Sequence, residues 1–393
     1  MEPLPSDKEF ALSLVRDDPP FRVLRSIGLI PRDGLGMARR ALFFTLLASL
    51  PIAIWAWIAG RAISAAAGEP LLQHFGVHVR CLVGIPVLIV AQGFAHGLTT
   101  QLLPWFVRSG VITADKADRF CDVVRGVGRL RSATLPWVAI AAIVIVWSAT
   151  GSMHTEGDEM SWAVNRAGSA ELGFGGWWFL FVARPIYISL VLGWAWRVVL
   201  LTVLFVRTAK LGLELVPTHP DGVGGLGFVE RFATMFAPIV FVLSAALASQ
   251  WAHQVLYHDI VVQTLRVPAV IFVVAMLLVF LAPLLVFAGP LISAKRRAKL
   301  EYGALVGEHG DLVRKRWILH ESVAKTDILD APELGPVADT VSLYDAVARM
   351  RPVPIGKAAL LAIAVPAVVP LLLMFALKVP IMDILVKLLH AVT

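Results

Sequence analysis

Residues 267–290 read VPAVIFVVAMLLVFLAPLLVFAGP. The run contains no charged side chain, and it is longer than the ~20 apolar residues that a helix needs to cross the hydrocarbon of a bilayer. A helix at the surface of a soluble domain would instead alternate apolar and polar faces with a period of 3.6 residues. The stretch therefore predicts a transmembrane helix and indicates the class of the whole chain.

The rest of the chain has the same character. Its 393 residues are 58% hydrophobic and only 16% charged, whereas soluble domains carry about 25% charged residues. The apolar residues are grouped in blocks of membrane length, which predicts an all-α, polytopic membrane bundle of about seven helices. The predicted spans are 41–60, 81–104, 134–151, 177–206, 236–257, 267–290 and 358–377.

Lysine and arginine are distributed unevenly between the connections. Most of the 35 such residues lie in the N-terminal segment and in every second connection after it, and few lie in the others. Cytoplasmic loops are enriched in positive charge, so the N-terminus is expected in the cytoplasm and the C-terminus outside. The net charge of +7 flanks the spans, which predicts contact with anionic lipids and no nucleic-acid partner. A homo-oligomer is left open.

The spans divide the chain into four parts. Residues 1–40 form a cytoplasmic or interfacial segment, and 41–290 hold six spans with a cytoplasmic loop at 207–235. Residues 291–357 are expected to form a small cytoplasmic helical cap, and 358–393 the seventh span with an outer amphipathic tail.

Local signals refine the two cytoplasmic parts. Ser6 and Glu9 have capping-box spacing, which predicts a helix through about Arg16 that Asp17 to Pro20 would end. Residues 21–30 alternate apolar and basic side chains, as in a segment on the membrane surface or in a packed linker. In the cap, Gly303, Gly307 and Gly310 are expected to interrupt a helix, and Ser342 to cap a short helix that ends at Pro352.

A glycine-rich loop, THPDGVGGLGF at 218–228, separates the fourth and fifth spans. Gly222, Gly224 and Gly227 match the dinucleotide fingerprint formally, but that motif requires a preceding strand, and here a membrane helix precedes it. One alternative is an anion cradle of free backbone N–H groups. The other is a tight turn in which Asp221 bonds to its own loop.

The same loop offers a pair of ligand-type side chains, His219 and Asp221. A metal site needs at least a third ligand, and none stands nearby in the sequence, so no metal and no cofactor are predicted. With the preceding residues 213–217, LELVP, the loop resembles the signature loop of a group of uncharacterised multi-pass bacterial inner-membrane proteins. The resemblance implies a bacterial inner membrane and a functional centre near 213–228, with the loop or gate formed by His219, Asp221, Gly222, Gly224, Gly225 and Gly227.

The predicted spans contain no aspartate or glutamate. Their ionisable residues are Arg184, Arg197, His96 and His253, so the only buried formal charges expected are positive. Buried cations need partners, and a cationic lining suits an anion. Alternatively, these side chains only hydrogen-bond between helices or reach the lipid headgroups.

The leading functional prediction is therefore the binding or conduction of a small anion or an anionic lipid group between spans two, four and five. The residues expected to line this path are Arg184, Arg197, His96, Gln92, Gln250 and His253. One alternative is a membrane-embedded enzyme that acts on a lipid-linked or phosphorylated substrate at the 218–228 loop. Another is a non-catalytic scaffold that holds partners through 291–357.

Overall fold

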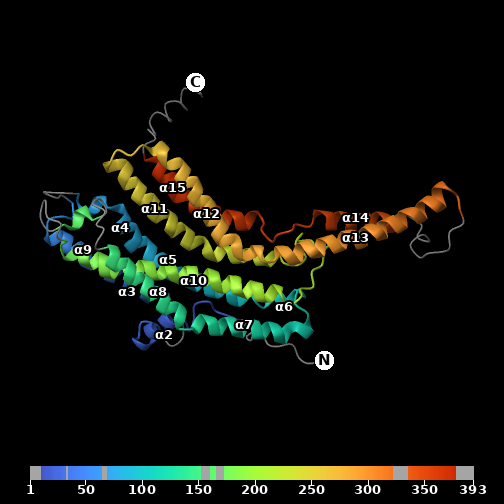
Figure 1. The fold of residues 1–393 in the computed structure, drawn as a ribbon, viewed down its shortest axis with the longest axis horizontal. Helices are drawn as coiled ribbons and strands as arrows, with labels where there is room; N and C mark the ends of the chain where they lie inside the picture. The colour runs from blue at the N-terminus through green and yellow to red at the C-terminus, as the bar shows by residue number, and fades with distance from the viewer. Residues whose placement is uncertain are drawn as a thin grey trace, which may run out of the picture.

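The structure is a computed structural model that describes residues 10–31, 34–63, 69–151, 160–164, 172–321 and 335–377. Across these residues the fold is helical, and the one β feature is an isolated bridge between Val164 and Leu172. The described residues include seven helical segments long and apolar enough to cross a membrane (Figure 1). The predicted all-α membrane bundle and its seven spans are thus confirmed.

The helices run along the bundle in an order that the ribbon shows from blue to red (Figure 1). Their bounds are α2 (Pro19–Ser26), α3 (Met37–Ile58), α4 (Phe75–His78), α5 (Ile85–Leu102), α6 (Trp105–Arg108), α7 (Ala117–Ser132), α8 (Leu135–Gly151), α9 (Phe174–Trp178), α10 (Arg184–Ala209), α11 (Ala237–Tyr257), α12 (Arg266–Leu285), α13 (Ala288–Val313), α14 (Gly335–Arg349) and α15 (Lys357–Ala376).

Two membrane helices begin with a wider turn. Residues Val79–Gly84 before α5 and Phe179–Ala183 before α10 are π-helical, and each is followed by a proline, Pro86 or Pro185. A proline ring collides with the carbonyl four residues earlier and lacks an N–H, so the preceding turn opens.

The N-terminal segment differs from its prediction. Residues 11–18 are not helical, and Asp17 has a positive φ of 68°. The prolines that were expected to end a helix instead begin α2, because their fixed φ suits the first helical turn. The prediction of a helix through Arg16 is therefore wrong for residues 11–16, while Ser6 and Glu9 lie outside the described residues.

Helices α13 and α14, which lie on either side of residues 322–334, pack against each other as the two arms of a hairpin. Contrary to the prediction, α13 continues through Gly303, Gly307 and Gly310. Each glycine costs a helix only about 1 kcal/mol relative to alanine, and packing against α14 offsets this cost. Ser342 lies inside α14 and does not cap it. Figure 1 shows α13 and α14 side by side, extending away from the membrane helices as a long arm.

An aromatic cluster lies next to the glycine loop and includes Phe228 at the end of that loop. The ring of Phe106 lies 4.9 Å from Phe228, 6.1 Å from Phe287 and 6.3 Å from Phe205, measured between centroids. Edge-to-face and tilted arrangements of this kind add to the free energy gained by burying the rings. The cluster thus joins the glycine loop to α6, α10 and the α12–α13 junction. Residues 378–393, with the predicted outer tail, lie outside the described part of the chain.

Candidate functional site

Four buried polar side chains meet where α2, α3, α5 and α10 come together: Asp18, Arg40, Gln92 and Arg197. Each is at most 5% exposed. Arg40 Nη2 donates a hydrogen bond to Gln92 Oε1 over 2.8 Å, and Arg197 Nη2 donates to Asp18 Oδ2 over 3.4 Å. Arg197 also lies over the Trp194 ring, 5.3 Å from its centroid, so the guanidinium is held on two sides.

Asp18 brings a negative charge into this group from outside the spans. It is the N-cap of α2, and its Oδ1 accepts a hydrogen bond from the backbone N–H of Phe21 over 2.8 Å. The other carboxylate oxygen faces Arg197. Burial raises the pKa of Asp18 above its usual value, and Arg197 and the Phe21 N–H offset only part of this effect. The expectation that all buried formal charges are positive is therefore wrong.

A cavity of about 510 Å³ extends from this group. One face of α10 lines it at helical spacing, because Ile186, Leu190, Gly193 and Arg197 recur every three to four residues. The opposite walls come from α2, α3 and α8, and most of them are apolar. Their lining residues include Pro19, Val23, Leu24, Phe44, Trp137 and Ile140.

Gly193 lines the cavity next to Trp137 and Arg197. A Cβ atom at this position would lie 3.3 Å from the Trp137 ring and 3.5 Å from Arg197 Nη1. The missing side chain therefore leaves room for the indole and the guanidinium beside each other. A larger side chain at position 193 would occupy the space between them.

Several donors at the polar end of the cavity lack an acceptor. Arg40 Nε and Nη1, Arg197 Nε and Trp137 Nε1 are buried without a hydrogen-bond partner. Leaving a buried donor unsatisfied costs about 1–3 kcal/mol, and more when the group is charged. With two arginines and one aspartate the cavity is also positive overall. These features are complementary to an anionic group that accepts several hydrogen bonds.

The six predicted path residues fall into separate places. Gln92 and Arg197 line the cavity described above, whereas Gln250 and His253 line a small hollow of about 50 Å³ with His74 and Arg80. Arg184 and His96 are half-buried and line neither. The wall around Arg197 comes from the first, third and fourth spans and α2, with Gln92 from the second.

Sequence reasoning missed Asp18, Arg40 and Trp137. Arg40 counts among the basic residues of the N-terminal segment in the sequence, but it lies in the first turn of α3 and is buried. The available signal for Asp18 was the Asp-Pro-Pro sequence, which is typical of an N-cap followed by the first helical turn. No local signal connects Asp18 with Arg197.

The glycine loop is arranged around its own aspartate. Asp221 Oδ1 accepts hydrogen bonds from the N–H groups of Val223 and Gly225 over 2.8 and 3.2 Å, and Oδ2 accepts one from Gly227 over 2.8 Å. Burial alone would raise the pKa of Asp221. The hydrogen bonds from these N–H groups and from His219 lower the pKa by a larger amount, so its net shift is downward. The backbone donors considered for an external anion are thus occupied by the chain itself.

Positive φ angles explain the glycines of this loop. Gly222, Gly224 and Gly225 have φ of 67°, 66° and 95°, a region that side-chain-bearing residues rarely adopt. Arg351, which follows α14, donates to the Asp221 and Gly222 carbonyls through its guanidinium and backbone N–H, over 3.2 and 2.7 Å. The loop therefore joins the bundle to the base of the α13–α14 hairpin.

A larger hollow of about 880 Å³ lies between α12 and α15. Its lining is mostly aliphatic, with Asp259 and Arg266 as the charged residues near the start of α12. Such a surface suits lipid chains and offers few groups that would orient a specific ligand. The cavity at Arg197 combines apolar walls with buried charge and is the stronger candidate for a site.

Comparison of the chain with protein-family models, with curated proteins and with solved structures finds no match. The resemblance of the 213–228 stretch to bacterial inner-membrane proteins therefore stays a prediction.

Proposed function

We propose that the protein binds an anionic amphiphile in the cavity between α2, α3, α8 and α10. Its acidic headgroup would lie against Arg40 and Arg197, and its hydrocarbon chain would follow the apolar walls. The observation that carries this proposal is the set of buried donors without acceptors at one end of an otherwise apolar cavity.

The shape of the cavity favours an amphiphile over a small ion. From Arg197 to Ile186 the lining face of α10 spans about 16 Å at 1.5 Å per residue. The volume of about 510 Å³ is within the roughly 300–1,000 Å³ of small-molecule sites. A small hydrated anion would leave most of the apolar wall without a partner, whereas an acyl chain would cover it.

The position of α2 is consistent with entry from the membrane surface. Val23 and Ile27 are 60% and 63% exposed, whereas Phe21 is buried against the protein. Arg22 and Arg25 lie on α2 with Val23, and Ile27 is the C-cap of this helix. A helix with exposed apolar and basic side chains suits the headgroup region of an anionic membrane, and α2 forms one wall of the cavity.

The test is retention of lipid by the purified full-length chain. The protein is equilibrated with mixed phosphatidylglycerol and phosphatidylcholine vesicles, solubilised and gel-filtered, and the lipid bound per chain is measured by mass spectrometry. We expect selective retention of phosphatidylglycerol. A charged hydrogen bond contributes about 1.5–3 kcal/mol, so Arg40→Gln should weaken retention about tenfold or more.

Two further variants complete the design. Gly193→Leu fills the cavity without changing its charge, and it should also reduce retention. Arg266→Gln removes an arginine of α12 that lines the other hollow, and it should have no effect. Equal retention of both lipids, or unchanged retention in Arg40→Gln and Gly193→Leu proteins, would contradict the proposal.

A further inference from the structure

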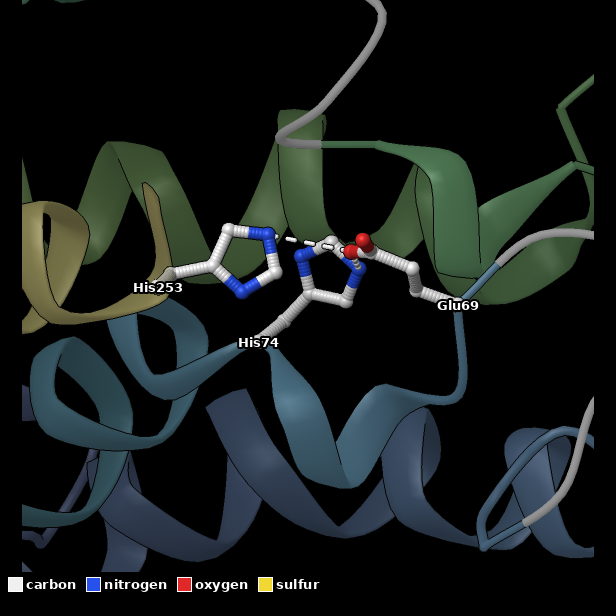
Figure 2. Close-up of side chains that lie close together, drawn as sticks. All are labelled: Glu69, His74 and His253. Carbon is white, nitrogen blue, oxygen red and sulfur yellow. Dashed lines mark ion pairs between the residues drawn. The ribbon is translucent and has the colours of Figure 1, made fainter. Parts of the chain in front are cut away.

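A second cluster of titratable side chains lies at the opposite end of the bundle from the glycine loop. Glu69, His74 and His253 each place one ligand-type atom within 4.8 Å of the other two (Figure 2). Glu69 Oε2 lies 3.0 Å from His253 Nε2 and 3.3 Å from His74 Nε2. His258 Nε2 approaches the other oxygen, Glu69 Oε1, to 3.5 Å.

Two distant parts of the sequence supply this cluster. Glu69 and His74 flank the 3₁₀ turn Leu71–Gln73, which connects α3 to α4. His253 lies in the last turns of α11, and His258 immediately follows that helix. His74 and His253 are buried, and their rings lie side by side with centroids 4.6 Å apart.

The hydrogen bonding of His253 fixes its tautomer. Its Nδ1 lies 3.0 Å from the carbonyl oxygen of Gln73, and because a carbonyl only accepts, Nδ1 carries the hydrogen. In the neutral ring, Nε2 then presents a lone pair toward Glu69. This arrangement, in which a backbone carbonyl orients a histidine through the nitrogen that faces away, recurs among histidines that ligate metals.

The contact between His253 and Glu69 lacks the geometry of a hydrogen bond. His253 Nε2 and Glu69 Oε2 are both buried, and neither has a hydrogen-bond partner, although they lie 3.0 Å apart. Two atoms with lone pairs repel at this distance unless a positive charge lies between them, which is either a proton on the imidazole or a metal ion. In a tetrahedral zinc site with bonds of about 2.0–2.1 Å, neighbouring ligand atoms are about 3.3 Å apart. The distances from Glu69 Oε2 to the two histidines are close to that value.

We propose that Glu69, His74 and His253 bind a divalent transition-metal ion of the Zn²⁺ type, with His258 completing the site. Imidazole nitrogens together with one carboxylate suit zinc and its neighbours, whereas Ca²⁺ and Mg²⁺ prefer oxygen ligands alone. Ser161 Oγ lies 3.1 Å from the same nitrogen, His74 Nε2, so a metal ion bound by His74 would replace this hydrogen bond. The bound ion connects the end of α11 to the segment between α3 and α4. This proposal departs from the sequence-based expectation of no metal, which considered only ligands close together in the chain.

The experiment uses the full-length chain in detergent, stripped of metal with a chelator and titrated with Zn²⁺ by calorimetry. We expect about one zinc per chain that survives gel filtration, and no binding of Mg²⁺ under the same conditions. Glu69→Gln and His253→Ala should each weaken Zn²⁺ binding about tenfold or more, as the loss of one ligand from a three- or four-ligand site requires. Substitution with Co²⁺ should give the visible absorption of a tetrahedral site.

His219→Ala is the matched control, since it removes a histidine that also pairs with a carboxylate, 2.9 Å from Asp221, at the other end of the protein. It should bind Zn²⁺ as the unmodified chain does. Glu69→Gln changes little in shape, so a monodisperse variant that no longer binds zinc supports the site even if His253→Ala fails to fold. No zinc retained by the unmodified protein, or equal affinity in Glu69→Gln protein, would show that the cluster is only an ion-pair network.

Discussion

Asp18 has two partners of different kinds, the N-terminus of α2 and the guanidinium of Arg197. The charged groups that face it are Arg197 on α10, Arg40 on α3 and Arg131 on α7. Because its carboxylate is buried beside the proposed headgroup site, the charge of Asp18 opposes an incoming anion. Its protonation state should therefore set the affinity of the cavity.

The raised pKa of Asp18 predicts a pH dependence. A carboxyl group with a raised pKa takes up its proton at a higher pH than usual, and loss of its charge leaves two arginines unopposed. Phosphatidylglycerol retention should therefore increase as the pH falls toward that pKa. Asp18→Asn, which keeps an N-capping side chain, should bind more tightly at neutral pH and lose the dependence.

The measurement is lipid retention between about pH 7 and pH 4, in the range above the ordinary carboxyl pKa of about 3.9. Asp115→Asn, a change at an exposed aspartate that precedes α7, serves as the control and should keep the pH profile of the unmodified chain. An identical profile in the Asp18→Asn protein would refute the role of Asp18.

The lowered pKa of Asp221 predicts a protein that is less stable at acidic pH. Its pKa is lowered in the folded protein, so its contribution to stability is present above the unfolded-state pKa of about 3.9 and is lost as the pH falls through the folded value. Asp221→Ala leaves three backbone N–H groups without their acceptor, and we expect a destabilisation of about 2–4 kcal/mol at neutral pH. Thermal unfolding in detergent at neutral and acidic pH measures this, and the two proteins should converge in acid.

At the scale of elements, the glycines of α13 and those of the glycine loop have different backbone conformations. Those of α13 are helical, whereas Gly222, Gly224 and Gly225 of the loop have positive φ. The position of Gly307 is helical, and a Cβ there meets no atom within 4 Å. Gly224 has a φ of 66°, and a Cβ would lie 3.1 Å from that of Leu215. Local sequence marked both as breakers of regular structure, but only the surroundings distinguish them.

Alanine substitutions should separate these two cases. Gly307→Ala should stabilise the protein by about 0.5–1 kcal/mol, because alanine has the higher helix propensity and loses less entropy on folding. Gly224→Ala should destabilise it by about 1 kcal/mol or more, because alanine disfavours positive φ. Denaturation midpoints of the two variants test the pair. A stabilised Gly224→Ala protein would contradict the described loop.

The elements that sequence could predict were those decided by composition. Each membrane helix coincides with an apolar block, since a buried backbone in lipid must satisfy its own hydrogen bonds as a helix. The continuity of α13 and the start of α14 at Gly335 depend instead on the packing of one helix on the other. Gly303 therefore does not interrupt α13 and Ser342 does not cap α14, although the local sequence predicted both.

For the whole molecule, the sites also divide into residues that composition reveals and residues that only folding brings together. Arg197, Gln92 and His253 could be identified because polar residues are conspicuous in apolar spans. Their partners Asp18 and Glu69 could not, since they lie in connecting segments and are brought close only by folding. The sequence predicted a single path, but the structure places its residues in two separate cavities, because only folding determines which polar residues lie together.

The orientation of the bundle gives a prediction at this scale. If the N-terminus is cytoplasmic, a cysteine placed at His219 should react with a membrane-impermeant thiol reagent only from the cytoplasmic side, and one at His258 only from outside. Both histidine positions are exposed, and the native Cys81 and Cys121 are buried and contribute little background. Labelling of intact and permeabilised cells measures this, and the reverse pattern would invert the topology.

The N-cap of α2 has a consequence for the peripheral part of the molecule. The carboxylate that begins this helix is also its charged link to α10, so a ligand phosphate that competes for Arg197 would loosen the attachment of the amino-terminal segment. Lipid bound in the cavity would then be detectable from the aqueous phase, as increased protease cleavage around residues 19–26.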